Sequence, residues 1–352
     1  DKTTLIISPI VASCGVPVAK MSGRGLGHTG GTIDKLEAIP GLKTAFTKDE
    51  FINIVTKTGI CVAGQSGNMA PADKKIYALR DVTGTVESLP LIASSIMSKK
   101  IAAGSDAILL DVKTGSGAFM KTLEDSITLA QEMVNIGEAA GRKTVALITD
   151  MDIPLGQNIG NSLEIIEVVK TLKGNGPEDL ANVCKALAVE MLMLAGKGNA
   201  SECAKMAEES IKSGKALDKF IEMVEAQGGD SSVIKNTDNF DRASLSKEVV
   251  AQQSGYIYKM DAEAIGLSSG MLGAGRDKEG AAIDYSAGII LERKTGDKVN
   301  KGDVIAYLYA NDDKKLNLGY ECFVESLEIS DNSPKDSKLI YARVDIDGVT
   351  RL

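Results

Sequence analysis

The segment Lys20–Glu37 carries residue types that bind an oxyanion. Its glycines let backbone N–H groups approach a ligand closely, because glycine has no side chain to hold the ligand away. Lysine and arginine add positive charge, and serine and threonine add hydroxyl groups. The order predicts a strand over 16–19, then Lys20 and Ser22 in a glycine-rich loop, then Thr32 leading into a helix. We therefore predict that this segment binds phosphate.

The same glycines could form only tight turns between a strand and a helix, since a glycine pattern by itself is a weak signal. The segment lacks the Gly-Lys-Ser/Thr run of a phosphate loop, and Gly23–Gly27 has the wrong spacing for a dinucleotide-binding motif. His28 is the only histidine in the chain. No carboxylate stands where it would orient His28 as a general base, so we interpret His28 as a residue that orders the loop.

A second set of polar residues comprises Tyr77, Arg80, Ser95 and Lys99. Ser95 and Lys99 are four positions apart, so on a helix they share one face. A hydroxyl and an ammonium on one face can bind the polar edge of a heterocycle. From spacing alone, Arg80 and Lys99 could equally be solvated charges, as most such residues are.

A third segment, Asp111–Met120, follows an apolar run and is rich in small residues. Small residues at the carboxyl end of a strand often line the ligand crevice of an open α/β sheet. A tight turn between a strand and a helix explains the same pattern equally well.

Short apolar runs alternate with helical patterns up to about residue 230, which predicts an α/β domain with a mostly parallel sheet flanked by helices. Residues 4–14 predict a helix that ends at Gly15 despite Pro9, and its start would point free N–H groups at an anion. The other predicted strands cover 60–63, 106–112 and 144–149, and the other predicted helices begin at Thr47 or cover 123–140, 178–195 and 200–228.

The pattern changes near residue 245, after a polar segment over 230–246 that we interpret as a linker. Beyond it, short β-type runs are broken by turns, so we predict a domain over 1–245 and a smaller β-rich domain over 246–352. The second domain is similar to the hammerhead of biotinyl carriers. Lys259 lacks the Met-Lys-Met context of a modified lysine, so we predict a structural module.

Composition argues against several classes of protein. The chain has 352 residues, enough for two domains, and its net charge of −8 argues against binding nucleic acid through general electrostatics. Its five cysteines show no CxxC spacing, which predicts free thiols in a reducing cytoplasm. No apolar run approaches the roughly 20 residues of a membrane span. The chain opens at Asp1 without Met or a leader, as expected of a piece cut inside a domain.

These motifs together resemble the pyrimidine-nucleoside phosphorylase and thymidine phosphorylase family. The resemblance covers essentially the whole chain and rests on Ser22–Glu37, Pro71–Lys75, Ala78–Val82, Ser95–Lys100, Asp111–Met120 and Leu272–Arg276. Two further segments, Pro154–Gly156 and Leu172–Pro177, are more similar to enzymes with broad uridine and thymidine specificity than to strict thymidine phosphorylases.

The resemblance implies that phosphate cleaves uridine, thymidine or deoxyuridine to the free base and a pentose 1-phosphate, in nucleoside salvage. Phosphate would be a co-substrate, and no organic cofactor is implied. The residues implied for phosphate are Thr4, Lys20, Ser22 and Thr32. Those implied for the pyrimidine are Tyr77, Arg80, Ser95 and Lys99. Arg80 and Lys99 would be catalytic, since they would stabilise negative charge on the departing base.

The resemblance also implies a homodimer and a structural monovalent cation, potassium, held by Lys2, Leu155, Asn158 and Glu167. Lys2 and Asn158 would contribute backbone oxygens. In the family, a Lys-His-Ser-Thr-Gly-Gly-Val-Gly segment that contacts phosphate and base, and a helical domain, precede the position of Asp1. This chain lacks both, so we expect it to release little or no uracil in a phosphorolysis assay.

Two alternatives stay open at this point. A phosphoribosyltransferase related to the anthranilate enzyme has a similar architecture, and it would release pyrophosphate from phosphoribosyl pyrophosphate. A regulatory module that binds phosphate or nucleotide without chemistry would bind uridine and phosphate and turn neither over.

Overall fold

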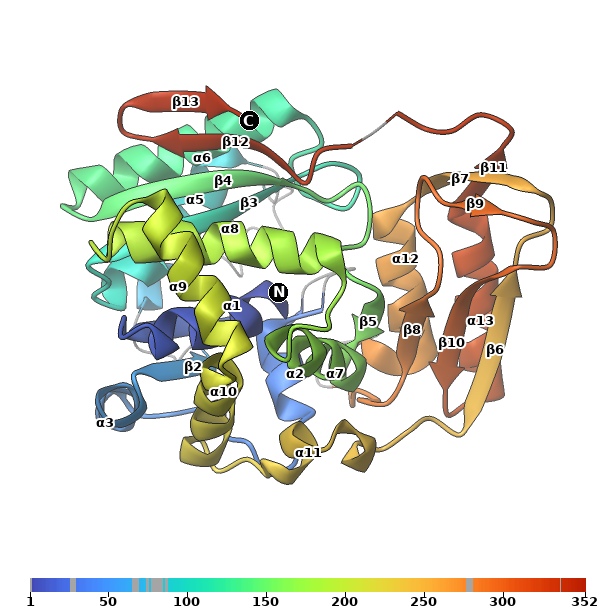
Figure 1. Cartoon of the computed structure of the whole chain (residues 1–352), viewed down its shortest axis with the longest axis horizontal. Coiled ribbons are helices and arrows are strands. Elements are labelled where there is room, and N and C mark those ends of the chain that lie inside the picture. The colour runs from blue at the N-terminus through green and yellow to red at the C-terminus, as the bar shows by residue number, and fades with distance from the viewer. Residues whose placement is uncertain are drawn as a thin grey trace.

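The computed structural model describes residues 2–25, 30–64, 70–73, 76, 85, 88–276, 281–335 and 337–352. Within these residues the chain forms an α/β part and a C-terminal part that lie beside each other (Figure 1). The predicted site residues Tyr77 and Arg80 lie outside the described residues, and so does His28.

The strands of the α/β part form two sheets in the described residues. Strands β1 (Val18–Ser22) and β2 (Ile60–Gly64) pair in parallel. Strands β3 (Ala107–Thr114) and β4 (Lys143–Asp150) also pair in parallel, and β12 (Ile340–Asp345) and β13 (Gly348–Arg351) extend that sheet antiparallel, in the order β13-β12-β4-β3. The predicted α/β class is confirmed, with an antiparallel edge that comes from the end of the chain.

Helices cover these sheets on both sides (Figure 1). Their bounds are α1 Lys2–Ser13, α2 Thr32–Glu37, α3 Lys48–Thr58, α5 Leu89–Ala102, α6 Leu123–Ala139, α7 Asn161–Leu172, α8 Glu178–Leu194, α9 Ala200–Lys212, α10 Lys215–Ala226 and α11 Ser232–Lys235. The helix predicted from Thr47 begins with a capping box, in which the Glu50 N–H donates to Thr47 Oγ1 at 3.3 Å and the Thr47 N–H donates to Glu50 Oε2 at 2.7 Å.

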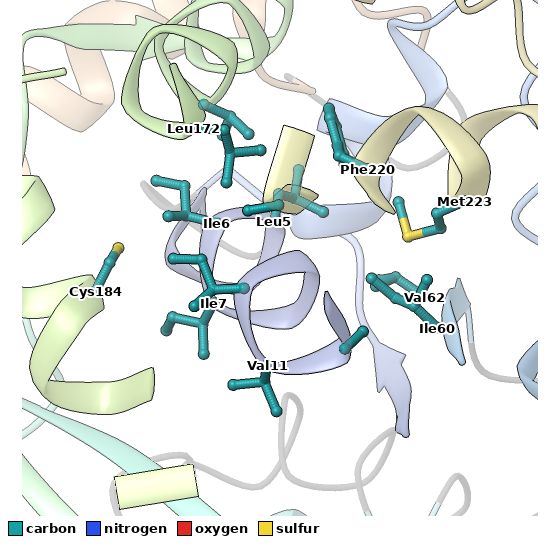
Figure 2. Packing of buried hydrophobic residues seen from close by; sticks show 14 of the residues in the cluster. Leu5, Ile6, Ile7, Val11, Ile60, Val62, Leu172, Cys184, Phe220 and Met223 are labelled. Atoms are coloured by element: carbon teal, nitrogen blue, oxygen red, sulfur yellow. The ribbon is translucent and has the colours of Figure 1, made fainter. Parts of the chain in front are cut away.

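Helix α1 forms the centre of the main core, because most of its residues are apolar and nearly all of them are buried. Its residues Leu5, Ile6 and Val11 are fully buried, and side chains from α7, α8, α10 and β2 surround the helix (Figure 2). The helix continues through Pro9 and is followed by Gly15 at φ +77°, as predicted. Burial of the whole helix outweighs the local cost of the proline.

The predicted helix over 200–228 is instead two helices, α9 and α10, which meet at Gly214. Gly214 has φ +81°, a left-handed conformation that ends a helix and that glycine adopts without strain. The predicted linker over 230–246 is not free of the core either. Ile234 and Phe240 are both buried in the main core, so this segment packs against the α/β part.

The C-terminal part has its own core, formed by residues of two sheets and two helices. Its strands are β6 Leu245–Val250, β7 Gly255–Met260, β8 Gly288–Leu291, β9 Lys298–Val299, β10 Val304–Ala310 and β11 Leu327–Ser330. Helices α12 (Ala262–Ser269) and α13 (Asp313–Glu325) were not predicted. Leu316 and Phe323 of α13 are buried in the core of this part, so tertiary packing contributes to the stability of the helix.

Two strand pairings join the parts on either side of residue 245. Strand β5 (Asn158–Gly160) pairs with β8, and β12 pairs with β4. The division into 1–245 and 246–352 therefore stays a prediction, and residues 340–351 lie in the sheet of the α/β part. No helix among the described residues is long and apolar enough to cross a membrane.

Candidate active site

Two of the residues predicted to bind phosphate, Lys20 and Ser22, lie on strand β1. They are two positions apart on a strand, so their side chains leave the same face. Pairing with Val62 and Gly64 of β2 holds that register. Burial lowers the pKa of Lys20 from its ordinary value, and the carboxylate of Asp111 opposes that shift. A partly desolvated ammonium of this kind gains strongly from a bound anion.

Thr32 is the first residue of α2 and is 1% exposed. Its hydroxyl Oγ1 is buried and has no hydrogen-bond partner among the residues that the structure describes. A buried hydroxyl without a partner is destabilising, and such groups are rare in native proteins. A phosphate oxygen would satisfy this hydroxyl, as the sequence prediction requires.

The ends of the glycine-rich loop are fixed by charged contacts. Asp34 accepts a hydrogen bond from the Gly25 N–H at 2.6 Å, and its carboxylate pairs with Arg24 at 3.2 Å and Arg276 at 2.8 Å. A Cβ at Gly31 would lie 2.2 Å from the Arg24 backbone, so only glycine fits there. Arg24 is therefore bound to acidic residues of α2 and does not serve as an anion ligand in this arrangement.

The pyrimidine side of the predicted site lies on α5. Lys99 Nζ donates to Ser95 Oγ at 2.9 Å and pairs with Asp73 Oδ2, also at 2.9 Å. Ser95 and Asp73 are both buried. The predicted shared face of Ser95 and Lys99 is thus present, and Asp73 is an additional residue that holds the Lys99 ammonium. Asp73 was not predicted to belong to the site, although it lies in Pro71–Lys75, one of the segments on which the family resemblance rests.

Lys100 follows Lys99 on α5 and is affected by the charges of residues from both predicted halves of the site. Burial lowers the pKa of Lys100, the positive charges of Lys20 and Lys99 lower it as well, and together these effects bring it to about 7. Lys20 belongs to the predicted phosphate side and Lys99 to the predicted pyrimidine side. Both charges act on Lys100, so it lies within electrostatic range of a residue from each predicted side. Lys100 was not among the residues predicted from the sequence, and Lys20, which acts on it, comes from a distant part of the chain.

Asp111 of β3 supplies the counter-charge of this region. Burial alone would raise the pKa of Asp111, but Lys113 at 2.8 Å and the Thr149 hydroxyl at 2.5 Å lower it below the ordinary value. After the strand, Gly115 has φ +120° and the Ser116 N–H donates to Asp152 Oδ1 at 2.6 Å. The segment Asp111–Met120 therefore includes a tight turn, while its first residue acts on Lys20 through charge.

Thr4, the remaining residue predicted to bind phosphate, lies in the first turn of α1 and is partly buried. Two residues before it, Lys2 is buried against Glu167 and forms an ion pair with it at 2.6 Å. Burial by itself lowers the pKa of Lys2, but the carboxylates of Glu167 and Glu164 outweigh it, so the pKa is raised.

Among the described residues, no group of three or more His, Cys, Asp or Glu side chains is arranged to hold a metal ion. A surface depression lined by α3 and the end of α10 includes none of the predicted site residues.

Comparison with known proteins identifies the class. The model of the glycosyl transferase family α/β domain matches residues 1–217, and that of the pyrimidine nucleoside phosphorylase C-terminal domain matches residues 256–330. Pyrimidine-nucleoside phosphorylase of Geobacillus stearothermophilus is 51% identical over 98% of this chain and 79% of its own length. That of Bacillus subtilis strain 168 is 55% identical over 88% of this chain and 72% of its own length. The chain belongs to the pyrimidine-nucleoside phosphorylase family, which is a family of enzymes.

A solved structure, anthranilate phosphoribosyltransferase from Thermus thermophilus, matches with a TM-score of 0.46 and 18% identity, over 64% of this chain and 73% of that one. A similarity of this size does not bear on which reaction the protein carries out.

Proposed function

We propose that the protein cleaves pyrimidine nucleosides with phosphate, releasing the free base and a pentose 1-phosphate. The observation that most directly supports the use of phosphate concerns Thr32. Its Oγ1 is buried without a hydrogen-bond partner among the described residues, in a segment that was predicted from the sequence to bind phosphate. Lys20 and Ser22 on the same face of β1 complete the described part of that anion site, and Thr4 belongs to it by resemblance.

In the proposed reaction, a phosphate oxygen attacks the anomeric carbon while the bond from that carbon to the base nitrogen breaks. The electron pair of the broken bond stays on the base, which leaves with growing negative charge. Lys99 and Arg80 would stabilise that charge more than they stabilise the neutral substrate, and this difference lowers the barrier. Ser95 and Tyr77 would orient the ring, and the lysine on the phosphate side would hold the nucleophile in line.

The test is an assay of the whole natural protein that contains this sequence, with uridine and phosphate. The proposal expects uracil and ribose 1-phosphate in equal amounts, and no uracil when phosphate is left out. Pyrophosphate release from phosphoribosyl pyrophosphate would support the phosphoribosyltransferase alternative. Saturable binding of uridine and phosphate without turnover would support the regulatory alternative, and either result would contradict the proposal.

Uridine and thymidine are proposed to be similar substrates, as in a broad-specificity enzyme. The relatives named above carry the name pyrimidine-nucleoside phosphorylase, which supports this choice over a strict thymidine enzyme. Comparing kcat/KM for uridine, deoxyuridine and thymidine tests it, and a preference for thymidine over uridine by more than about 100-fold would contradict it.

We also propose, from the family resemblance, that the natural protein is a cytoplasmic homodimer. Light scattering after size exclusion should give twice the mass of one chain. A single-chain mass at micromolar concentration would contradict the dimer.

Asp73 offers a test of the pyrimidine side. Replacing Asp73 with asparagine keeps the size of the side chain but removes the charge that holds Lys99 Nζ at 2.9 Å. We expect kcat/KM for uridine to fall about 10- to 100-fold, the range for losing one hydrogen bond to a charged group. The KM for phosphate should not change. Asp241→Asn makes the same chemical change at an exposed position and should leave both kinetic parameters unaltered. An equal loss of kcat/KM in that control would contradict the role given to Asp73.

A further inference from the structure

The Lys2 ammonium is bound at the place where the family resemblance implies a monovalent cation. Lys2 Nζ donates to the backbone oxygen of Asn158 at 2.7 Å and to Glu167 Oε2 at 2.6 Å. The side chains of Lys2 and Glu167 are 9% and 2% exposed, so this contact is made almost without water. The side chain of Lys2, and not its backbone oxygen, is the part that meets the implied ligands.

The donor set of this site therefore does not fit a potassium ion. The other carboxylate oxygen, Glu167 Oε1, accepts the N–H groups of Gln157 at 2.7 Å and Asn158 at 3.0 Å. A Cβ at Gly156 would lie 2.4 Å from Glu167 Oε2, which shows how closely the backbone covers this carboxylate. A second cation beside the Lys2 ammonium would be repelled at short range in a poorly solvated environment.

We propose that the Lys2 ammonium replaces the monovalent cation, so that this protein needs no potassium for its stability or activity. An ammonium carries the same single charge, and here it bridges the same kind of oxygens, a backbone carbonyl and a carboxylate. Because Lys2 is part of the chain, the bridge forms with folding and does not depend on the salt in solution. The inference concerns folding as well as activity, so it can be tested whether or not the proposed reaction is correct.

The bridge has a structural purpose, which is to hold the segment Leu155–Asn158 between the two parts of the molecule. Lys2 ties this segment to α1, and Glu167 ties it to α7. The Gly156 N–H donates to Asp179 Oδ2 at 3.0 Å, and Lys294 of the C-terminal part donates to the Gly156 oxygen at 3.0 Å. The segment leads directly into β5, which pairs with β8 of the C-terminal part (Figure 1).

The first experiment needs no variant. Thermal unfolding of the whole natural protein is measured in potassium chloride, ammonium chloride and choline chloride at equal ionic strength of about 0.1 M. We expect the same Tm in all three salts, to within about 1 °C, and the same rate of uracil release. A Tm higher in potassium than in choline by several degrees would overturn the proposal, and so would saturable potassium binding measured by calorimetry.

The second experiment removes the internal cation. Lys2→Ala leaves the Glu167 carboxylate buried without its charge partner, so in choline chloride we expect Tm to fall by about 5 to 10 °C. Potassium or ammonium should restore at least half of that loss, because the freed oxygens then accept a cation from solution. A loss that is the same in all three salts would overturn the proposal.

Two controls isolate the site. In Lys2→Ala/Glu167→Gln the carboxylate charge is also gone, so the response to potassium should disappear. Lys212→Ala, which removes an exposed lysine of α9, should leave Tm unchanged in every salt. A potassium response that persists in the double variant would place the cation elsewhere and overturn the assignment. If Lys2→Ala does not fold in choline, recovery of folded protein by refolding in potassium or ammonium supports the proposal, and failure to refold in any of the salts contradicts it.

Discussion

Replacing Lys20 with methionine should lower kcat/KM for phosphate by about 100- to 1000-fold, the effect of removing one charge-stabilising donor from an active site. The substitution keeps the length of the side chain and removes only the ammonium. Nucleoside binding should be retained, because Ser95 and Lys99, the residues proposed for the pyrimidine, are held by contacts with each other and with Asp73. The measurement is a steady-state assay of the whole natural protein, with phosphate varied at saturating uridine.

The same variant should not be less stable than the native protein. Burial lowers the pKa of Lys20, which means that the folded state disfavours its charged form. Methionine removes that penalty, so the free energy of unfolding should stay the same or rise while activity falls. Lys212→Met on α9 is the matched control and should change neither quantity. A loss of less than about threefold in kcat/KM would contradict the place of Lys20 in the phosphate site.

Lys100 should make anion binding depend on pH near neutrality. Its pKa is lowered to about 7 by burial and by Lys20 and Lys99, so in the free protein it loses its proton as the pH rises through that value. A bound anion favours the protonated form, and the pKa is then higher in the complex. Between these two pKa values, affinity should fall about tenfold for each pH unit.

Sulfate is the suitable probe, because its charge does not change over this range, whereas phosphate itself titrates. Its inhibition constant against phosphate is measured from pH 6.5 to 8.5. In Lys100→Arg the guanidinium stays charged, so the pH dependence of sulfate affinity should flatten. Lys100→Met should bind sulfate more weakly at pH 6.5. An unchanged pH profile in the arginine variant would contradict the role of Lys100.

The lowered pKa of Lys100 also makes the stability of the free protein depend on pH. The folded-state pKa of Lys100 lies below its unfolded value of 10.5, so the unfolded state binds more protons between about pH 7 and 10.5. The contribution of Lys100 to stability therefore rises with pH across that window. Anion binding should reduce this dependence, since it returns the proton to Lys100.

Local patterns predicted much of the fold. Helix α1 was predicted to continue past Pro9 because Gly15 marks its end. The capping box at Thr47 marks the start of α3. Where the prediction was incomplete, tertiary packing decided the outcome. Helix α13 buries Leu316 and Phe323 in the core of the C-terminal part, and β12 pairs with β4, which lies far earlier in the chain.

Lys20, Ser22 and Thr32 were proposed to bind phosphate because of their order in a glycine-rich segment, and the structure places Lys20 and Ser22 on one strand face. Their roles stay a prediction. Asp73 and Lys100 were not predicted, because the contact of Asp73 with Lys99 and the effect of Lys20 on Lys100 join segments that are distant in the sequence. Lys2 was predicted to contribute a backbone oxygen, whereas the ion pair of its side chain with Glu167 becomes visible only when α1 and α7 are packed together.

The proposed mechanism requires the lysines of the phosphate side and of the pyrimidine side to open onto one shared cavity. The most direct measurement is a crystal structure of the whole natural protein with sulfate and uracil bound. We predict sulfate within hydrogen-bond distance of Lys20 Nζ and Thr32 Oγ1, and uracil against Ser95 and Lys99 in the same cavity. Sulfate bound away from Lys20, or uracil separated from it by protein, would contradict the account.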